Sequence, residues 1–262
     1  MNLSLKGKKA IVCGSSQGIG EATAIKLSQQ DANVILVARN ETKLKKVLKK
    51  LKLSSFQEHQ YLVADFSDHK NCINQFSKFI NDGQEIDILI NNTGGPPPGE
   101  ISDAKIQDFK KYMDMHLYCS HSITQLVLPN MKKKNFGRII NIISISVKTP
   151  INNLGVSNTI RWAMASWSKT LSNEVAKNGI TVNNILPGFT MTERLKDLIK
   201  ENAISQNLSL GKIEKNYKSI IPTRRFGKPE EIGSSIAFLC SNEAGYINGI
   251  NLPIDGGFSP SL

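Results

Sequence analysis

Short runs of apolar residues alternate along this chain with longer segments in which apolar residues recur at helical spacing. Turn residues bound each short run, so we predict buried strands there and amphipathic helices between them. The predicted strands are residues 9–13, 33–38, 60–64, 86–91, 137–142, 181–186 and 250–254. The predicted helices are about 19–30, 41–52, 70–81, 106–131, 158–178 and 229–240. Such alternation is typical of a parallel sheet with helices on both faces, so we predict an α/β, doubly wound sheet of about seven strands.

The length of 262 residues suits one such domain, because the chain contains no repeat and no linker. We therefore predict a single domain over residues 1–262. The Pro- and Gly-rich stretch 94–99 directly follows a predicted strand and is interpreted as a rigid loop at the edge of the site. Residues 192–222 alternate irregularly between polar and apolar types, which favours a mobile lid that selects the substrate.

The charge balance changes this picture little. Lys and Arg number 33 against 22 Asp and Glu, a net charge of +11 that would suit an anionic partner. The densest basic run, 43–52, keeps Leu44, Val47, Leu48 and Leu51 at helical spacing, so its lysines are best interpreted as the solvated face of a helix. No aromatic residues interleave with them, and we expect no nucleic-acid partner.

The sequence also disfavours metal-binding, secreted and membrane proteins. Four cysteines stand singly, without the paired spacing of a zinc site, so we expect reduced thiols and no metal. The first nine residues are polar and basic, which disfavours a secretion signal. No stretch approaches the roughly 20 apolar residues of a membrane span, so we expect a cytoplasmic protein without a membrane partner.

A glycine-rich turn joins the first predicted strand to the first helix. Its candidate contacts are Gly14, Ser16, Gln17, Gly18, Ile19 and Gly20. Glycines there let the backbone approach a diphosphate, and the helix N-terminus supplies N–H donors. An ordinary strand-to-helix turn is the alternative.

Arg39 follows the second predicted strand, where an acidic residue would hydrogen-bond the ribose hydroxyls of NAD. The forked guanidinium of an arginine suits a 2′-phosphate instead, so we predict NADP, with NAD as the less favoured cofactor. A solvated arginine at a strand end is the alternative.

Several motifs in order resemble the short-chain dehydrogenase/reductase superfamily over nearly the whole chain. They are the Gly14, Gly18, Gly20 spacing, Asn91-Asn-Thr-Gly94, the strand ending in Ser144, Pro187-Gly188 and Asp255-Gly-Gly257. The resemblance is nearest to members similar to 3-oxoacyl-[acyl-carrier-protein] reductases. It implies cofactor contacts by Asp65, Phe66, Asn91, Thr93, Gly94, Pro187, Gly188, Thr190 and Thr192. It also implies that the protein is a homodimer or homotetramer.

The match departs from the family at the catalytic positions. In the family a Ser orients the carbonyl, a Tyr thirteen residues later donates a proton, and a Lys four residues after it lowers the Tyr pKa and holds the ribose. Ser144 matches the serine, but Ser157 and Arg161 stand at the Tyr and Lys positions, as in an atypical branch of the family. An aliphatic hydroxyl is a far weaker acid than a phenol, whose pKa is ~10. Arg161 can supply charge and hold the ribose hydroxyls of the cofactor, but it cannot relay a proton.

His116 stands where the family carries an Asn that supports a relay water, and it is a further candidate proton donor. A structural histidine on a helix is the alternative that we favour. The first functional hypothesis is therefore an NADP(H)-dependent oxidoreductase that interconverts a carbonyl and an alcohol, on a small molecule or an acyl thioester such as a 3-oxoacyl thioester. Its proton would come from His116, Ser157 or water. The second hypothesis is a catalytically impaired nucleotide-binding protein that acts as a sensor or an assembly partner.

Overall fold

The computed structural model describes residues 1–260 and contains one seven-stranded parallel sheet in the order β3-β2-β1-β4-β5-β6-β7. Its strands are β1 (Lys9–Cys13), β2 (Asn33–Ala38), β3 (Gln60–Val63), β4 (Ile88–Asn91), β5 (Gly137–Ile142), β6 (Ile180–Pro187) and β7 (Asn251–Ile254). The order reverses between β1 and β4, which creates the topological switch point where such sheets bind ligands. The predicted α/β, doubly wound fold is confirmed.

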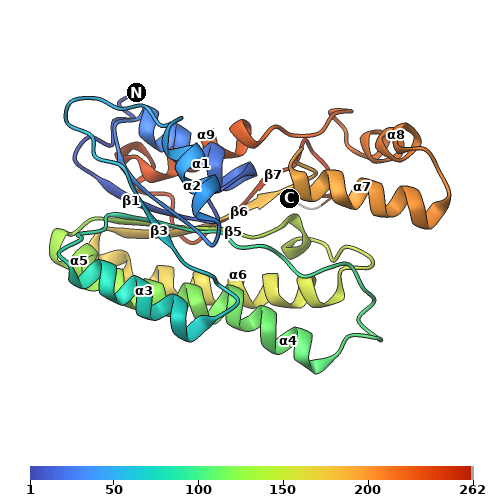
Figure 1. Cartoon of the computed structure of the whole chain (residues 1–262), viewed down its shortest axis with the longest axis horizontal. Helices are drawn as coiled ribbons and strands as arrows, with labels where there is room; N and C mark the ends of the chain where they lie inside the picture. Colours follow the sequence, from blue (N-terminus) through green and yellow to red (C-terminus); the bar gives the residue numbers. More distant parts are fainter. Residues whose placement is uncertain (261–262) are drawn as a thin grey trace.

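Helices cover both faces of this sheet (Figure 1). On one face lie α1 (Gly18–Gln29), α2 (Glu41–Leu48) and α9 (Pro229–Cys240), and on the other lie α3 (His69–Asn81), α4 (Ile106–Met113), α5 (Cys119–Lys134) and α6 (Gly155–Val175). Short 3₁₀ turns lie at Ile145–Val147, Ala176–Asn178 and Asn242–Ala244.

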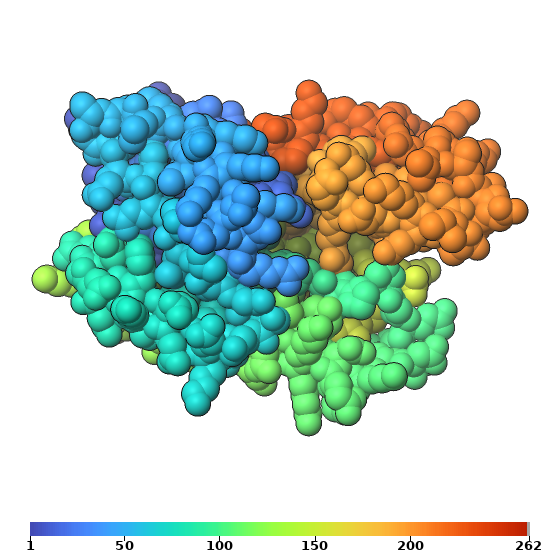
Figure 2. Space-filling model, in the orientation of Figure 1, coloured from blue at the N-terminus to red at the C-terminus, as the bar shows by residue number. Residues whose placement is uncertain are grey.

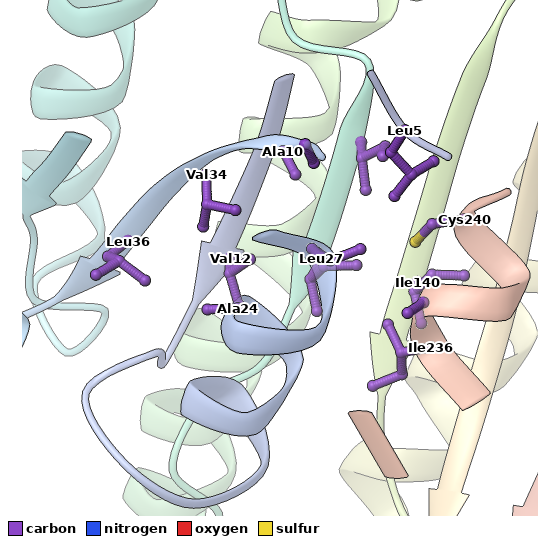
Figure 3. Close-up of a cluster of buried hydrophobic side chains, with 14 of the residues drawn as sticks. Leu5, Ala10, Val12, Ala24, Leu27, Val34, Leu36, Ile140, Ile236 and Cys240 are labelled. Atoms are coloured by element: carbon purple, nitrogen blue, oxygen red, sulfur yellow. The ribbon is translucent and has the colours of Figure 1, made fainter. Parts of the chain in front are cut away.

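The core on either side of the sheet follows from strand alternation. Ala10 and Val12 of β1 point into a cluster with Leu27 of α1 and Ile236 of α9, part of which Figure 3 shows. The alternate residues Ile11 and Cys13 pack on the opposite face, against α3, α5 and α6. A one-residue shift in β1 would therefore exchange both faces at once, so its register is strongly fixed.

The predicted helix 106–131 differs from the structure. A π-helical turn, Asp114–Tyr118, separates α4 from α5, because one extra residue is accommodated there. π-Helical turns of this kind recur at functional sites. Here the turn carries His116, whose side chain is buried.

The segment expected as an irregular lid also differs. It contains α7 (Glu193–Gln206) and α8 (Leu210–Ile220), which project from one end of the sheet (Figure 1). Leu195, Ile199 and Ile213 form a small core of their own with Phe226. The segment thus consists of two packed helices. Exposed apolar residues such as Ile204 and Leu210 interrupt the helical pattern in its sequence. Helix α2 likewise ends at Leu48, four residues earlier than predicted.

Candidate functional site

A cleft of about 550 Å³ opens at the switch point, where β1 and β4 end. In Figure 2 the surface is hollowed between the blue N-terminal elements and the orange segment that carries α7 and α8. Eleven of the predicted site residues line it, namely Gly14, Ser16, Gln17, Gly18, Ile19, Arg39, Asp65, Phe66, Thr93, Gly94 and Thr192. The topology thus brings most of the predicted cofactor residues to one place.

The glycine-rich turn leaves no space for side chains. Gly14 has a φ of +61°, and a methyl group on it would lie 2.6 Å from the Asn92 side chain. A side chain on Gly20 would run into the Gly14 carbonyl, although Gly20 itself does not line the cleft. No side chain caps the N-terminus of α1, so its first N–H groups face the cleft without a side-chain acceptor. This arrangement fits a diphosphate.

Positive charge collects at the end of the cleft beside β2 and β3. Arg39 is exposed and lines the cleft, and the Lys43 ammonium donates to Gln17 Oε1 at 2.7 Å. Asp65 accepts from the backbone N–H of Ser67 at 2.9 Å and from its hydroxyl at 2.8 Å. These hydrogen bonds, and more weakly Arg39, hold the pKa of Asp65 below its usual value. Lys43 had been assigned only to the solvated face of a helix, and its link to Gln17 depends on the fold.

Asn91 was predicted to contact the cofactor, but it does not line the cleft. It is buried, and its amide donates to Asn141 Oδ1 at 2.8 Å. Asn141 donates in turn to Asn184, and Asn184 to Asn251, so four amides in register link β4 to β7. Asn92, the next residue, lines the cleft instead and donates to the carbonyls of Cys13 and Gly14.

Pro187, Gly188 and Thr190 also lie outside the lining of the cleft. A side chain on Gly188 would lie 2.7 Å from Asp255, so packing against the segment after β7 explains this glycine. The Thr190 hydroxyl donates to the Gly188 carbonyl at 3.1 Å. Thr192, in contrast, reaches the cleft and caps α7 by accepting from Leu195 N.

His116 lies behind the loop that follows β4. Its Nδ1 lies 2.7 Å from Thr93 Oγ1, and its Nε2 lies 3.1 Å from the Gly94 carbonyl. Both partners are satisfied when the Thr93 hydroxyl donates to Nδ1 and Nε2–H donates to Gly94. Burial, and next the charge of Arg161, hold the His116 pKa well below its usual value. The imidazole is therefore neutral at neutral pH, and its single N–H proton is donated to the Gly94 carbonyl.

Ser144, Ser157 and Arg161 do not line the cleft. Ser144 Oγ accepts from Ser146 N at 3.1 Å, the backbone cap expected of a serine at a strand end. Ser157 and Arg161 stand one turn apart on the buried face of α6. Arg161 Nη1 donates to the Ile142 carbonyl at 3.2 Å, and burial lowers the Arg161 pKa to about 10. Arg161 therefore stays charged at neutral pH.

Several lining residues were not predicted individually, although Gly95, Glu193 and Arg194 belong to the predicted loop 94–99 and the predicted lid 192–222. Arg194, in the first turn of α7, donates to the carbonyls of Gly95 and Pro96 at 3.1 and 2.7 Å. Gly95 lines the cleft, as do Lys111, Tyr112 and Met115 from the helices on the other side and Glu193 beside Arg194. Charge and aromaticity alone do not distinguish these residues from surface positions, so their placement follows from the packing of the lid and of α4.

Comparisons with known proteins agree with this geometry. A family model described as enoyl-(acyl carrier protein) reductase matches residues 14–259. The chain belongs to the short-chain dehydrogenase/reductase superfamily. It is 33% identical to the NADPH-dependent reductase BacG of Bacillus subtilis, over 97% of this chain and 99% of that protein. It is 34% identical to the 3-oxoacyl-[acyl-carrier-protein] reductase FabG of Haemophilus influenzae, over 97% and 98%.

A solved relative has the same fold. The L-sorbose reductase from Gluconobacter frateurii, complexed with NADPH and L-sorbose, superposes with a TM-score of 0.92 at 28% identity, over all of both chains. Within residues 1–260, no group of His, Cys, Asp and Glu side chains could hold a metal ion. None of the helices in that range is long and apolar enough to cross a membrane.

Proposed function

We propose that this member of the oxidoreductase superfamily binds NADP(H) in the cleft and interconverts a carbonyl and an alcohol. The observation that carries the proposal is the turn 14–20, which presents uncapped N–H groups of α1 and leaves no room for a side chain at Gly14 or Gly20. Arg39 and Lys43 supply cations where a 2′-phosphate would lie. The rest of the cofactor would be held by Gly14, Gly18, Asp65, Phe66, Thr93, Gly94 and Thr192.

When bound, NADPH supplies a hydride to the carbonyl carbon of the substrate. The protein must then orient the carbonyl and stabilise the charge that develops on its oxygen. We assign orientation to the Ser144 hydroxyl and charge stabilisation to Arg161, which stays cationic at neutral pH. Both assignments rest on the positions of these residues at the carboxyl end of β5 and on the facing turn of α6.

The proton donor is the atypical part of this mechanism. Burial and the charge of Arg161 keep His116 neutral, and its hydrogen bonds occupy both ring nitrogens, so we assign it a positioning role. The proton would then reach the alkoxide from water or from the hydroxyl of Ser157, which stands at the predicted Tyr position. A water-fed donor is weaker than a tuned phenol, and we expect slow turnover.

A second candidate function is a nucleotide-binding sensor or assembly partner with little reductase activity. The observation that favours it is the combination of Ser157, Arg161 and a neutral His116, none of which is a strong proton donor. The cofactor cleft would serve this function equally well. The two candidates therefore differ in turnover and agree in binding.

The experiment that tests the proposal is a titration of NADPH and NADH by fluorescence, followed by a panel of ketones, aldehydes and 3-oxoacyl thioesters. NADPH binding with its oxidation on any substrate supports the reductase. NADPH binding without turnover favours the sensor or assembly partner, and failure to bind either nucleotide contradicts both.

We further propose that the protein acts in the cytoplasm as a homodimer or homotetramer. The four cysteines are unpaired, as expected in a reducing compartment. Trp162 on α6 and Tyr118 at the end of the π-helical turn expose 51% and 46% of their surfaces, which favours an interface on this helical face. Light scattering after size exclusion tests the oligomeric state, and a monomer would contradict it.

A further inference from the structure

Two arginines from distant parts of the chain meet beside Gly95. A methyl group on Gly95 would lie 3.0 Å from Arg161 Nη2 and 3.2 Å from Arg194 Nη2. Arg161 comes from α6 and Arg194 from the first turn of α7, so two guanidinium groups converge on one point. Gly95 and Arg194 both line the cleft, and Arg161 approaches Gly95 without lining the cleft itself.

Neither arginine has an anionic partner at ion-pair distance among residues 1–260. Arg161 is 8% exposed, donates only to the Ile142 carbonyl, and has a buried Nε without any hydrogen-bond partner. Arg194 donates to the carbonyls of Gly95 and Pro96. Arg161 is thus a buried cation held only by a neutral carbonyl, which is costly because its desolvation is not offset by an opposite charge, whereas Arg194 is exposed.

The surroundings add to this positive field. Arg194 stands in the first turn of α7, a 14-residue helix whose N-terminus carries partial positive charge. The two guanidinium groups also repel each other, and burial followed by that repulsion lowers the pKa of Arg161. The acidic groups that influence Arg194 are Tyr112 and Glu201, and neither forms an ion pair with it. An anion at Gly95 would relieve all of these costs.

We propose that the Arg161–Arg194 pair receives the carboxylate of the substrate, so that the substrate is an oxo acid. This proposal rests on the proposed reductase function and narrows it. The anion site is distinct from the diphosphate turn at 14–20, because Gly95 belongs to the loop after β4. Arg161 is bound to Ile142, two residues before Ser144, so the carboxylate would lie near the carbonyl that Ser144 orients.

The reaction then leaves the carboxylate unchanged. The carbonyl carbon of the oxo acid accepts the hydride, the oxygen accepts a proton from water, and the products are a hydroxy acid and NADP⁺. A charge so close to the carbonyl favours short oxo acids over long acyl thioesters, whose anionic groups lie far from the reacting carbon. The pair would hold the carboxylate by charge-assisted, bidentate hydrogen bonds.

The test compares oxo acids with their methyl esters on the intact protein with NADPH. Pyruvate, acetoacetate and phenylpyruvate are the probes, measured by NADPH oxidation and, independently of turnover, by calorimetry. We expect the acids to bind at least about tenfold more tightly than the esters. Arg194→Gln should weaken acid binding by about tenfold to a hundredfold, because it removes a charge-assisted hydrogen bond.

Lys196→Gln is the matched control. It removes one positive charge from the same helix, at a side chain that is 50% exposed and paired with Glu193. We expect it to change acid binding by no more than about twofold. Arg194→Lys keeps the positive charge and serves as a second test in case Arg194→Gln does not fold. We expect it to retain the preference for acids over esters.

Several outcomes would overturn the oxo-acid proposal. One is equal binding of oxo acids and their methyl esters. Another is that Arg194→Gln weakens NADPH binding as much as it weakens acid binding, because Arg194 would then bind the cofactor. If acids bind preferentially through Arg194 and no substrate is turned over, the anion site stands and the reductase function fails.

Discussion

The Thr93 hydroxyl and His116 Nδ1 lie 2.7 Å apart, and this hydrogen bond joins the loop after β4 to the π-helical turn. On the other side of the ring, His116 Nε2 faces the Gly94 carbonyl at 3.1 Å. Thr93 and Gly94 both line the cleft, so the orientation of the cleft wall depends on a neutral imidazole behind it. His116 thus acts on the site through the loop that it holds.

Stability should therefore depend on pH through His116. The folded-state pKa of His116 lies well below 6.5, so below pH ~6.5 the unfolded chain binds a proton that the folded chain excludes. Stability is then complete above pH ~6.5 and is lost as the pH falls, by up to about 1.4 kcal/mol per pH unit. Urea unfolding of the protein and of His116→Asn between pH 7.5 and 5 measures the difference.

The Asn variant should show a flatter profile over that interval, because it lacks the imidazole at position 116, while the other three histidines are common to both proteins. Parallel profiles for the two proteins would contradict a buried, neutral His116. At pH 7.5 the variant should be less stable by about 1–3 kcal/mol, because the Thr93 hydroxyl and Gly94 carbonyl lose a fitted partner.

Cofactor preference depends on Arg39. Replacing Arg39 by Asp should weaken NADPH binding by about tenfold to a hundredfold, because a 2′-phosphate would lose a charge-assisted partner and meet a negative charge. NADH has no such phosphate, so its affinity should change by no more than about threefold. Fluorescence titration of both nucleotides measures the ratio.

Lys45→Gln is the control for Arg39→Asp, since Lys45 is exposed and pairs with Glu41 on the same surface of α2. It should leave the affinities for both nucleotides unaltered. Equal losses of NADPH and NADH affinity in Arg39→Asp would remove the basis for preferring NADP.

A phenol can be introduced at the position where the family resemblance places the catalytic Tyr. If Ser157 and Arg161 stand at the Tyr and Lys positions as predicted, the double variant Ser157→Tyr with Arg161→Lys should reduce neutral ketones faster by about a hundredfold. A neutral ketone is needed because Arg161 also belongs to the proposed anion site. Steady-state NADPH oxidation measures the rate, and thermal unfolding checks that the buried Tyr is accommodated. An unchanged rate in a folded, NADPH-bound double variant would contradict a deficient proton donor.

Sequence periodicity predicted the elements whose apolar faces are broad. Helix α9 was predicted with the observed ends, because Pro229 marks its first residue and Ile232, Ile236 and Leu239 form a continuous buried face. Helix α7 was missed because only Leu195, Ile199 and Ala203 are buried on it. Its partners Phe189 and Tyr217 come from other segments, and only the folded chain brings them together.

The site likewise contains features that the sequence predicts and features that only the fold reveals. Glycine spacing located the turn 14–20, because steric limits on the backbone are local and visible in the sequence. Which asparagine of the Asn91–Asn92 pair faces the cleft depends on where β4 ends and on its register with Asn141. The meeting of Arg161 and Arg194 at Gly95 depends on how the lid packs, which the sequence does not specify locally.

The close packing of the glycine-rich turn leads to a final prediction. Gly20→Ala would drive a methyl group into the Gly14 carbonyl, so we expect a loss of about 1–3 kcal/mol of stability and at least tenfold weaker NADPH binding. Gly211→Ala is the matched control, because a methyl group at Gly211 in the first turn of α8 would meet no atom within 4 Å. Since alanine is the better helix former, the control should gain up to about 1 kcal/mol and bind NADPH normally. Differential scanning calorimetry and NADPH titration on both variants measure these effects, and normal NADPH binding by a folded Gly20→Ala protein would show that the turn does not approach the diphosphate.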